Sequence, residues 1–340
     1  MLNFGIIGVG AIGDVHARAI QELKEAKLIA IASRTEEKAR EAGEKYGCAF
    51  YTDYNEMLKR DDLDIVSICL PSGMHYQAAM AAAAAGKHCI VEKPMEISAE
   101  RGEGMIEAFD KYGLKLSVIF QHRFDKSTQL IKNAISHNTL GKLNYGTSKT
   151  LWFRDDAYYQ NSNWRGTWQG DGGGALMNQA IHSIDLLQYL MGPVEAVCGK
   201  CASLYHEYME TEDLGVALLK FKSGAIGTIE GTTLAYPGFY GEVGIFGQSG
   251  SAVIKNDKLD FYQFKSGTDE ALEELKMNGD EQLSYGWYNL VPHIRQYEDV
   301  INAVINNRQP LVTGEEGLKS VRIIRGIYES SKKNEWIEID

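Results

Sequence analysis

The chain has 340 residues, which suits two domains, and its 44% hydrophobic and 24% charged content is that of a soluble globular protein. Its formal net charge of −11 argues against a nucleic-acid-binding protein, because such a protein needs a basic surface to displace counterions. The N-terminal stretch is interrupted by glycines and lacks a basic region, and the five cysteines show no framework spacing, so we expect no signal peptide, no membrane association and a reduced, cytoplasmic protein.

Short apolar runs alternate with helical patterns over the first part of the chain. The runs expected to form strands are FGIIGVG (4–10), LIAIASR (28–34), CAFY (48–51), IVSICLP (65–71), HCIVEKP (88–94) and LKLSVIF (114–120). Helical patterns separate them at 14–26, 36–46, 78–85 and 99–111. Strands that are apolar on both faces and alternate with helices indicate a doubly wound parallel sheet in an α/β domain.

The pattern changes after residue 122, where longer and partly alternating strands begin. These strands are expected at 143–153, 194–205, 215–221, 225–235, 242–247, 251–255 and 259–264. Helices are expected at 128–136, at 176–191 and from residues 292 and 315, and the polar stretch 265–284 should form an exposed excursion. The sequence therefore predicts two domains, 1–122 and 123–340, the second an α/β domain with an open, mainly antiparallel sheet.

A glycine pattern directly follows the first expected strand. Gly8, Gly10 and Gly13, with Ala11 and Ile12 between the last two, form GxGxxG where a strand turns into a helix. In this position the glycines permit a tight turn, close approach of a pyrophosphate and close helix–strand packing. The helix N-terminus also supplies N–H groups to the phosphate. The first domain is therefore predicted to be an NAD(P)-binding Rossmann domain.

The end of the second expected strand indicates which dinucleotide binds. An acid there would hydrogen-bond a ribose 2′-hydroxyl, but the chain has Ser33 and Arg34, with Lys38 one helical turn later. A hydroxyl and two cations suit a 2′-phosphate, so NADP is slightly favoured over NAD. An arginine can also stack on adenine, and Lys38 can be a solvated helix residue, so NAD stays open as the alternative.

Polar residues stand where two apolar strands end. Glu92 and Lys93 follow the run CIV, and Pro71 and Ser72 end the preceding sheet strand, with His75 on the next turn. Ligands of doubly wound folds bind at this carboxyl edge, so all five residues are expected to contact the cofactor. Lys93 can also polarise a substrate oxygen beside the nicotinamide. The alternative is that lysine and proline simply end a strand.

The glycine run 172–174 leads into an amphipathic helix that carries three polar residues. Asn178, His182 and Asp185 are spaced at i, i+4 and i+7, which predicts that they share one helical face. Three polar groups on an apolar helix are costly to bury without partners, which favours a catalytic role for His182, with Asp185 available to fix its tautomer. The alternative is a core histidine satisfied by a neighbouring side chain.

The sequence predicts no metal site. Cys198 and Cys201 form a lone CxxC pair without a second cluster of cysteine or histidine nearby. Metal sites need such a cluster, so ordinary strand positions explain the pair better.

Over essentially its whole length the chain resembles the Gfo/Idh/MocA oxidoreductase family. The resemblance lies in GIIGVGAIG, AGKHCIVEKP, QHRF, GGGALMNQAIHSIDLL and RQPLVTGEEGL. It implies an N-terminal Rossmann domain and a C-terminal α/β domain whose open sheet forms the interface of a homodimer or homotetramer. It also implies that Lys93 and His182 serve proton transfer during hydride exchange with a sugar or polyol.

One residue departs from the family pattern. Many members carry Asp four residues before the histidine, where this chain has Asn178, and an amide can orient a hydroxyl but cannot relay its proton. GGGALMNQAIHSIDLL and the upstream NWRGTW are similar to the branch that contains UDP-N-acetylglucosaminuronate 3-dehydrogenases. Those enzymes favour NAD, which Ser33 and Arg34 do not obviously fit.

Aromatic and polar residues precede the glycine run. Trp164 and Arg165 lie in NWRGTW, and aromatic faces with polar neighbours suit the flat apolar faces and the hydroxyls of a sugar ring. We expect both to contact substrate, together with Arg123 of QHRF. The alternative for these residues is core or subunit packing.

The expected activity is that of an NAD(P)-dependent dehydrogenase acting on a secondary alcohol of a sugar, polyol or sugar derivative. His182 would serve as acid and base, Lys93 would polarise the oxygen and Asn178 would position the ring. Two other classes stay open: an NAD-dependent glycosidase or lyase that oxidises the ring transiently, and a cofactor-binding regulatory protein.

Overall fold

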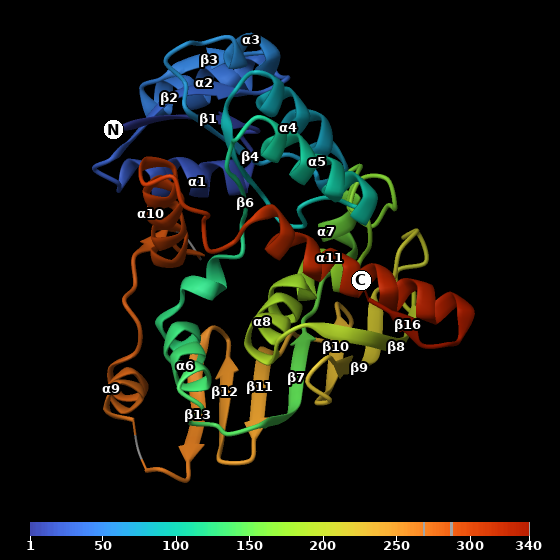
Figure 1. Cartoon of the computed structure of the whole chain (residues 1–340). Coiled ribbons are helices and arrows are strands. Elements are labelled where there is room, and N and C mark those ends of the chain that lie inside the picture. The colour runs from blue at the N-terminus through green and yellow to red at the C-terminus, as the bar shows by residue number, and fades with distance from the viewer. Residues whose placement is uncertain (268, 286–287, 340) are drawn as a thin grey trace. The chain divides into compact units, whose positions relative to one another are not determined.

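The computed structural model describes residues 1–267, 269–285 and 288–339, and the chain forms two compact units (Figure 1). The first comprises Met1–Gln121 and Gln282–Leu318, and the second comprises His122–Glu281 and the chain from Lys319 on. The division expected after residue 122 assigns 282–318 to the second domain. The structure places this segment in the first unit, because its helix packs against the first helix of the chain.

The first unit is built on a six-stranded parallel sheet with the order β3-β2-β1-β4-β5-β6 (Figure 1). Its strands are β1 (Leu2–Ile7), β2 (Ala26–Ala32), β3 (Ala49–Tyr51), β4 (Ile65–Ile68), β5 (His88–Val91) and β6 (Leu116–Val118). The strand order reverses between β1 and β4, and doubly wound sheets bind ligands at such a reversal. The predicted Rossmann architecture is confirmed.

The helices of the first unit follow the expected alternation with the strands. They are α1 (Ala11–Gln21), α2 (Glu36–Tyr46), α3 (Tyr54–Leu58), the 3₁₀ turn η1 (Ser72–Met74), α4 (His75–Ala84), α5 (Ala99–Lys111) and α10 (Val291–Ile305). Two short antiparallel strands, β14 (Ser284–Tyr285) and β15 (Tyr288–Asn289), pair with each other before α10 begins. α1 packs against α10, and α4 packs against α5. α1 begins earlier than the expected residue 14, because Gly10 is extended and serves as its N-cap.

The second unit contains an eight-stranded mixed sheet with the order β13-β12-β11-β7-β10-β9-β8-β16 (Figure 1). Its strands are β7 (Leu143–Leu151), β8 (Val194–Ala202), β9 (Leu214–Phe221), β10 (Ile226–Thr232), β11 (Gly241–Gly247), β12 (Gly250–Lys255), β13 (Lys258–Phe264) and β16 (Ile337–Glu338). Only the pair of β7 and β10 is parallel among these neighbours. The expected mainly antiparallel sheet is confirmed.

Several helices of the second unit pack on one face of its sheet. The helical elements of this part of the chain are the 3₁₀ turn η2 (Gln121–Phe124), α6 (Lys126–Ser136), α7 (Asp156–Gln160), the π-helical turn η3 (Ala175–Ala180), α8 (Ile181–Met191), α9 (Glu270–Asn278) and α11 (Gly314–Lys333). α8 packs on β7 and β11, and α6 packs on α8 and β12. On β9, Ala217 and Leu219 are buried while Val216 and Leu218 are 45% and 49% exposed, so the other face of the sheet is open.

The expected excursion at 265–284 contains structure of its own. Asp269 caps α9, and Leu272 and Leu275 of this helix are buried, because the helix packs on α6 and β13. Residue 268 lies outside the described residues. Among the helices within the described ranges, none is long and apolar enough to cross a membrane.

Candidate active site

The three glycines of GxGxxG have different surroundings, and together they form a cradle for a dinucleotide. Gly8 has φ +104°, and a Cβ there would lie 2.4 Å from the carbonyl oxygen of Cys69. A Cβ on Gly13 would lie 2.1 Å from the oxygen of Gly8, whereas a Cβ on Gly10 would meet no atom within 4 Å. This open space lies at the N-terminus of α1, which begins at Ala11 and whose first N–H groups have no partner within the helix. These features fit a pyrophosphate on the helix N-terminus.

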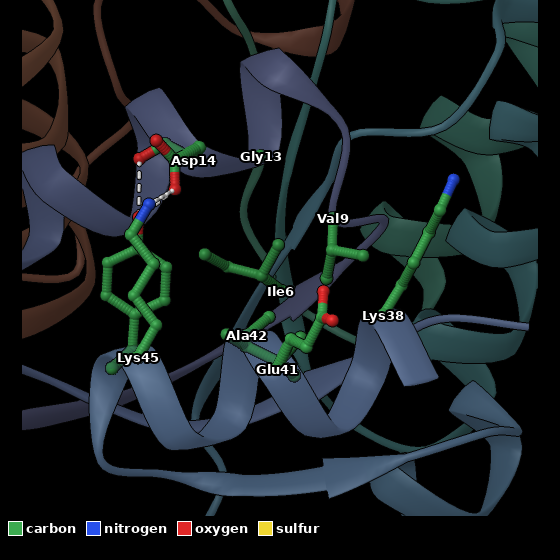
Figure 2. Close-up of a pocket in the computed structure, with 10 residues that line it drawn as sticks. Ile6, Val9, Gly13, Asp14, Lys38, Glu41, Ala42 and Lys45 are labelled. Atoms are coloured by element: carbon green, nitrogen blue, oxygen red, sulfur yellow. Dashed lines mark hydrogen bonds and ion pairs between the residues drawn. The ribbon is translucent and has the colours of Figure 1, made fainter. Parts of the chain in front are cut away.

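A cleft of about 320 Å³ lies between α1 and α2, behind this loop. Figure 2 shows Lys38, Glu41 and Lys45 projecting from α2, and Asp14 from α1. Asp14 accepts hydrogen bonds from Lys45 and from the hydroxyl of Tyr46, so its charge is already paired. Lys38 lines the same cleft, so it brings a cation to the wall.

Ser33 and Arg34 lie just beyond the end of β2, as the sequence predicts. The backbone N–H of Ser33 donates to the carbonyl oxygen of Tyr51 at 3.0 Å, which fixes the backbone at this point. Ser33 is half-buried and Arg34 is exposed. Both residues therefore follow the carboxyl edge of the sheet, where the ribose of a dinucleotide binds in doubly wound folds.

His75 ties together the segments that follow β4 and β5. Its Nδ1 lies 2.9 Å from the carbonyl oxygen of Pro94, and its Nε2 lies 2.9 Å from that of Leu70. Burial lowers the pKa of His75. Pro71 caps the η1 turn, and Ser72 is buried at its start. The structure thus gives His75 a role in holding the loop that carries Lys93.

Glu92 lies beneath the backbone of Lys93 in a buried hydrogen-bond network. Its Oε2 accepts from the N–H of Lys93 at 3.0 Å, and its Oε1 lies 2.8 Å from Nε2 of His16. Nδ1 of His16 lies 2.6 Å from Oγ of Ser67 and 2.8 Å from the hydroxyl of Tyr297. Glu92 therefore orients the peptide group of Lys93. Its expected contact with the cofactor stays a prediction.

Charges within this network stabilise one another. Burial lowers the pKa of His16, but Cys69 and Glu92 raise it, to about 10. Burial raises the pKa of Glu92, but the hydrogen bond and charge of His16 and the charge of Lys93 bring it below the usual value. His16 and Glu92 therefore form a buried ion pair. The sequence analysis did not single out His16, Ser67 or Tyr297.

The glycine run of the second unit allows a very close backbone approach. The N–H groups of Gly174 and Leu176 donate to the carboxylate of Glu212 at 2.9 and 2.8 Å, and Tyr328 donates to it at 2.8 Å. A Cβ on Gly174 would lie only 1.8 Å from the carbonyl oxygen of Glu212. Burial raises the pKa of Glu212 to about 7. These bonds hold the start of the helix that carries His182.

Asn178 lies in the π-helical turn rather than in a regular helix, so its spacing from His182 differs from the expected i, i+4 geometry. Its Nδ2 donates to Oδ1 of Asp171 at 2.6 Å, and its Oδ1 accepts from Nε2 of Gln179 at 2.7 Å. Asp171 is buried and also accepts from the N–H of Gly166 at 3.1 Å. The amide of Asn178 is therefore held in one orientation.

His182 and Asp185 both lie on α8, but Asp185 is occupied by other partners. Arg123 donates to it from Nε at 2.8 Å and from Nη2 at 2.7 Å, and Ser320 donates at 3.2 Å. Arg123 is fully buried, and its guanidinium lies 4.5 Å from the ring centroid of Tyr189. Arg123 is therefore held in a buried ion pair with Asp185, and its contact with substrate stays a prediction. His182 instead has the ring of His122 beside it, which the sequence analysis did not evaluate.

Trp164 and Arg165 lie together in the loop that follows α7. The guanidinium of Arg165 lies 4.3 Å from the ring centroid of Tyr158 and 5.4 Å from that of Trp164, and it donates to the carbonyl oxygen of Tyr158 at 3.1 Å. Both side chains are half-buried. Part of each side chain is therefore accessible to a ligand, and Tyr158 of α7 holds the guanidinium of Arg165 in place.

Comparisons with known proteins identify the family of both domains. The family model described as "Oxidoreductase family, NAD-binding Rossmann fold" matches residues 2–120, and the one described as "Oxidoreductase family, C-terminal alpha/beta domain" matches residues 132–339. The chain belongs to the Gfo/Idh/MocA oxidoreductase family. The predicted family and the predicted class of NAD(P)-dependent oxidoreductase are thereby confirmed.

Several dehydrogenases are similar to this Gfo/Idh/MocA chain over its full length. Myo-inositol 2-dehydrogenase of Thermotoga maritima is 29% identical, over 100% of this chain and 99% of that protein. scyllo-Inositol 2-dehydrogenase (NADP(+)) of Bacillus subtilis is 27% identical, over 100% and 96%. The WlbA dehydrogenase of Bordetella pertussis, solved in complex with NADH and UDP-GlcNAcA, is 32% identical with a TM-score of 0.92, over 100% of this chain and 98% of that chain.

Proposed function

We propose that this protein is an NAD(P)-dependent dehydrogenase acting on a secondary alcohol of a sugar, polyol or sugar derivative. The observation that carries the proposal is the glycine cradle, where Gly10 leaves open space at the N-terminus of α1. Its relatives support the substrate class, because they are named for inositol substrates or were solved with a nucleotide sugar. When bound, the nicotinamide cofactor accepts or returns the hydride.

The residues of the chain would bind the substrate and move its proton. In the oxidative direction, His182 accepts the hydroxyl proton and Lys93 polarises the oxygen that carries it. Asn178 donates an amide N–H to a ring hydroxyl, since Asp171 and Gln179 hold its orientation. Trp164 offers an aromatic face to the ring and Arg165 a cation to its polar groups. Glu92 positions Lys93 through its backbone N–H.

The same proposal favours NADP slightly over NAD as the cofactor. Arg34 and Lys38 are exposed cations near the end of β2, and Lys38 lines the cleft between α1 and α2. Two cations and the hydroxyl of Ser33 suit a 2′-phosphate. The similarity to an NADP(+)-dependent inositol dehydrogenase supports this preference, and the similarity to a dehydrogenase solved with NADH supports the alternative.

We further propose that the protein forms a homodimer or homotetramer through the open face of its second sheet. Val216, Leu218 and Ile226 are 45%, 49% and 55% exposed on the neighbouring strands β9 and β10. Adjacent exposed apolar side chains on a sheet face favour burial against another surface. Light scattering on the wild type and on a Leu218→Glu variant tests this arrangement, and a monomeric wild type would contradict it.

The absorbance of reduced nicotinamide tests the proposed activity. NAD⁺ and NADP⁺ are supplied separately against a panel of inositols, free sugars, glycosides and UDP-sugars. We expect reduction of the cofactor with at least one member of the panel, faster with NADP⁺ than with NAD⁺. Glycoside cleavage without net reduction would instead indicate the glycosidase or lyase class.

A further inference from the structure

His122 lies beside His182, the residue to which the proposed reaction assigns proton transfer. Both belong to the second unit, His122 in the turn η2 and His182 in α8. Their rings meet edge to face, with centroids 5.2 Å apart and an interplanar angle of 87°. The protonation state of one ring therefore affects that of the other.

Two carboxylates face the same nitrogen of His122. Oδ2 of Asp125, at the N-cap of α6, lies 2.8 Å from Nδ1, and Oδ1 of Asp257, in the turn between β12 and β13, lies 3.4 Å from it. A carboxylate only accepts hydrogen bonds, so Nδ1 carries a proton in this arrangement. The side chains of His122 and Asp125 are only 21% and 7% exposed, so water screens their attraction weakly.

The charges around His122 favour its cationic form. Burial lowers the pKa of His122, but the charges of Asp257, Asp125 and Asp185, together with the hydrogen bond to Asp125, raise it to about 9. Asp280 adds a further negative charge near Asp125. The guanidinium of Arg123 partly offsets the charge of Asp185. His122 is therefore an imidazolium at neutral pH, in contact with the ring of His182.

We propose that His122 is a positioning residue whose positive charge keeps His182 neutral, and so ready to accept a hydroxyl proton. A cation in contact with a second imidazole disfavours protonation of that imidazole. The edge-to-face contact also restricts rotation of the His182 ring. The catalytic consequence rests on the proposed function, whereas the charge relation between the two rings holds in the protein without substrate.

Histidine-selective isotope labelling and NMR titration of the full chain without substrate measure this relation independently of turnover. The chain has 8 histidines, and the resonance lost in His182→Gln assigns His182. In His122→Gln we expect the pKa of His182 to rise by about one unit, because unit charges at this separation in a partly hydrated site couple on that scale. The acid limb of the pH profile of kcat/KM should move upward equally.

Two further variants, and the titration of His122 itself in the wild type, test the proposal even if His122→Gln perturbs the fold. Asp257 has φ +63° and a side chain that is 61% exposed, and asparagine adopts this conformation readily, so Asp257→Asn should fold. Removing this carboxylate should lower the pKa of His122 without raising that of His182, because Asp125 still keeps His122 charged at neutral pH. His137→Gln, at the exposed end of α6, is the matched control and should leave that pKa unchanged. An unchanged His182 pKa in His122→Gln, or a His122 that titrates below neutral pH in the wild type, would overturn the proposal. A raised pKa in a protein without dehydrogenase activity would support it and reject only the proposed function.

Discussion

Asn178 donates a hydrogen bond from Nδ2 to Oδ1 of Asp171, at 2.6 Å, and Asp171 is 1% exposed. The resemblance to the Gfo/Idh/MocA family leads one to expect an aspartate at position 178, and in this chain a carboxylate contacts the amide instead. Because Gln179 donates to Oδ1 of Asn178, the donor end of the amide points at Asp171. Asp171 therefore determines how Asn178 can meet a hydroxyl.

Asp171→Asn should lower kcat/KM while leaving the fold intact. In the variant, the amide oxygen at position 171 can still accept from the N–H of Gly166, but an NH₂ group replaces the oxygen that faces Asn178. The side-chain amide of Asn178 therefore loses the acceptor that fixes its orientation. We expect a fall of about tenfold or more, as for loss of a hydrogen bond to a charged group. Steady-state kinetics measure it. Glu210→Gln, an exposed acid that accepts from the N–H of Trp168, is the control, and equal activity in the two variants would contradict this role.

Arg123→Met should destabilise the protein strongly. Removing the arginine leaves Asp185 buried without its main partner, which costs about 3–5 kcal/mol of unfolding free energy in comparable ion pairs. Urea denaturation measures the change, and Arg123→Met with Asp185→Leu should recover part of it. Arg308→Met breaks the more exposed pair with Asp299 and should cost at most about 1 kcal/mol. An equally small loss for Arg123→Met would show that the buried pair is not needed for stability.

Gly10→Ala and Gly13→Ala should separate cofactor binding from folding. A methyl group at Gly10 meets no protein atom within 4 Å, so the variant should keep its melting temperature but bind the dinucleotide weakly. A methyl group at Gly13 would clash with the oxygen of Gly8, so that variant should be destabilised even without cofactor. Thermal unfolding and fluorescence titration with the reduced cofactor measure the two effects. Unchanged cofactor affinity in Gly10→Ala would place the pyrophosphate elsewhere.

The His16–Glu92 pair should make stability depend on pH. Burial lowers the pKa of His16 and its neighbours Cys69 and Glu92 raise it to about 10, above the value of 6.5 expected in the unfolded chain. The stabilisation that comes from the proton of His16 is therefore complete below about pH 6.5, where Glu92 is still ionised, and is lost as the pH rises through about 10. The free energy of unfolding of the wild type should fall over this interval more steeply than that of His16→Gln. Parallel curves for the two proteins would mean that His16 is neutral in the fold.

The sequence predicted the features that depend on local pattern. The alternation of apolar runs and helical patterns predicted the parallel sheet. The spacing of Gly8, Gly10 and Gly13 predicted the nucleotide cradle, because the space around these three glycines is set within a single short turn of the chain. The roles assigned to Lys93 and His182 stay predictions that the kinetic experiments test.

The remaining features depend on contacts between distant parts of the chain. Tyr297 reaches Ser67 from a segment 230 residues later, and nothing in the run PHIRQYEDV signals that contact. Asp257 reaches His122 from a hairpin turn in the same way. The π-helical turn at Asn178 follows from the bonds between Glu212 and the backbone after the glycine run, so periodicity alone predicts a regular helix there.

The central claim is net hydride transfer between a nicotinamide cofactor and a sugar or polyol, with Lys93 acting on the substrate oxygen. The most direct test measures reduced cofactor and ketone product together, in the wild type and in Lys93→Met, with cofactor affinity determined for both. The account predicts equimolar formation of the two products by the wild type, and loss of both in the variant with cofactor binding retained. Product without reduced cofactor, or normal turnover by Lys93→Met, would contradict it.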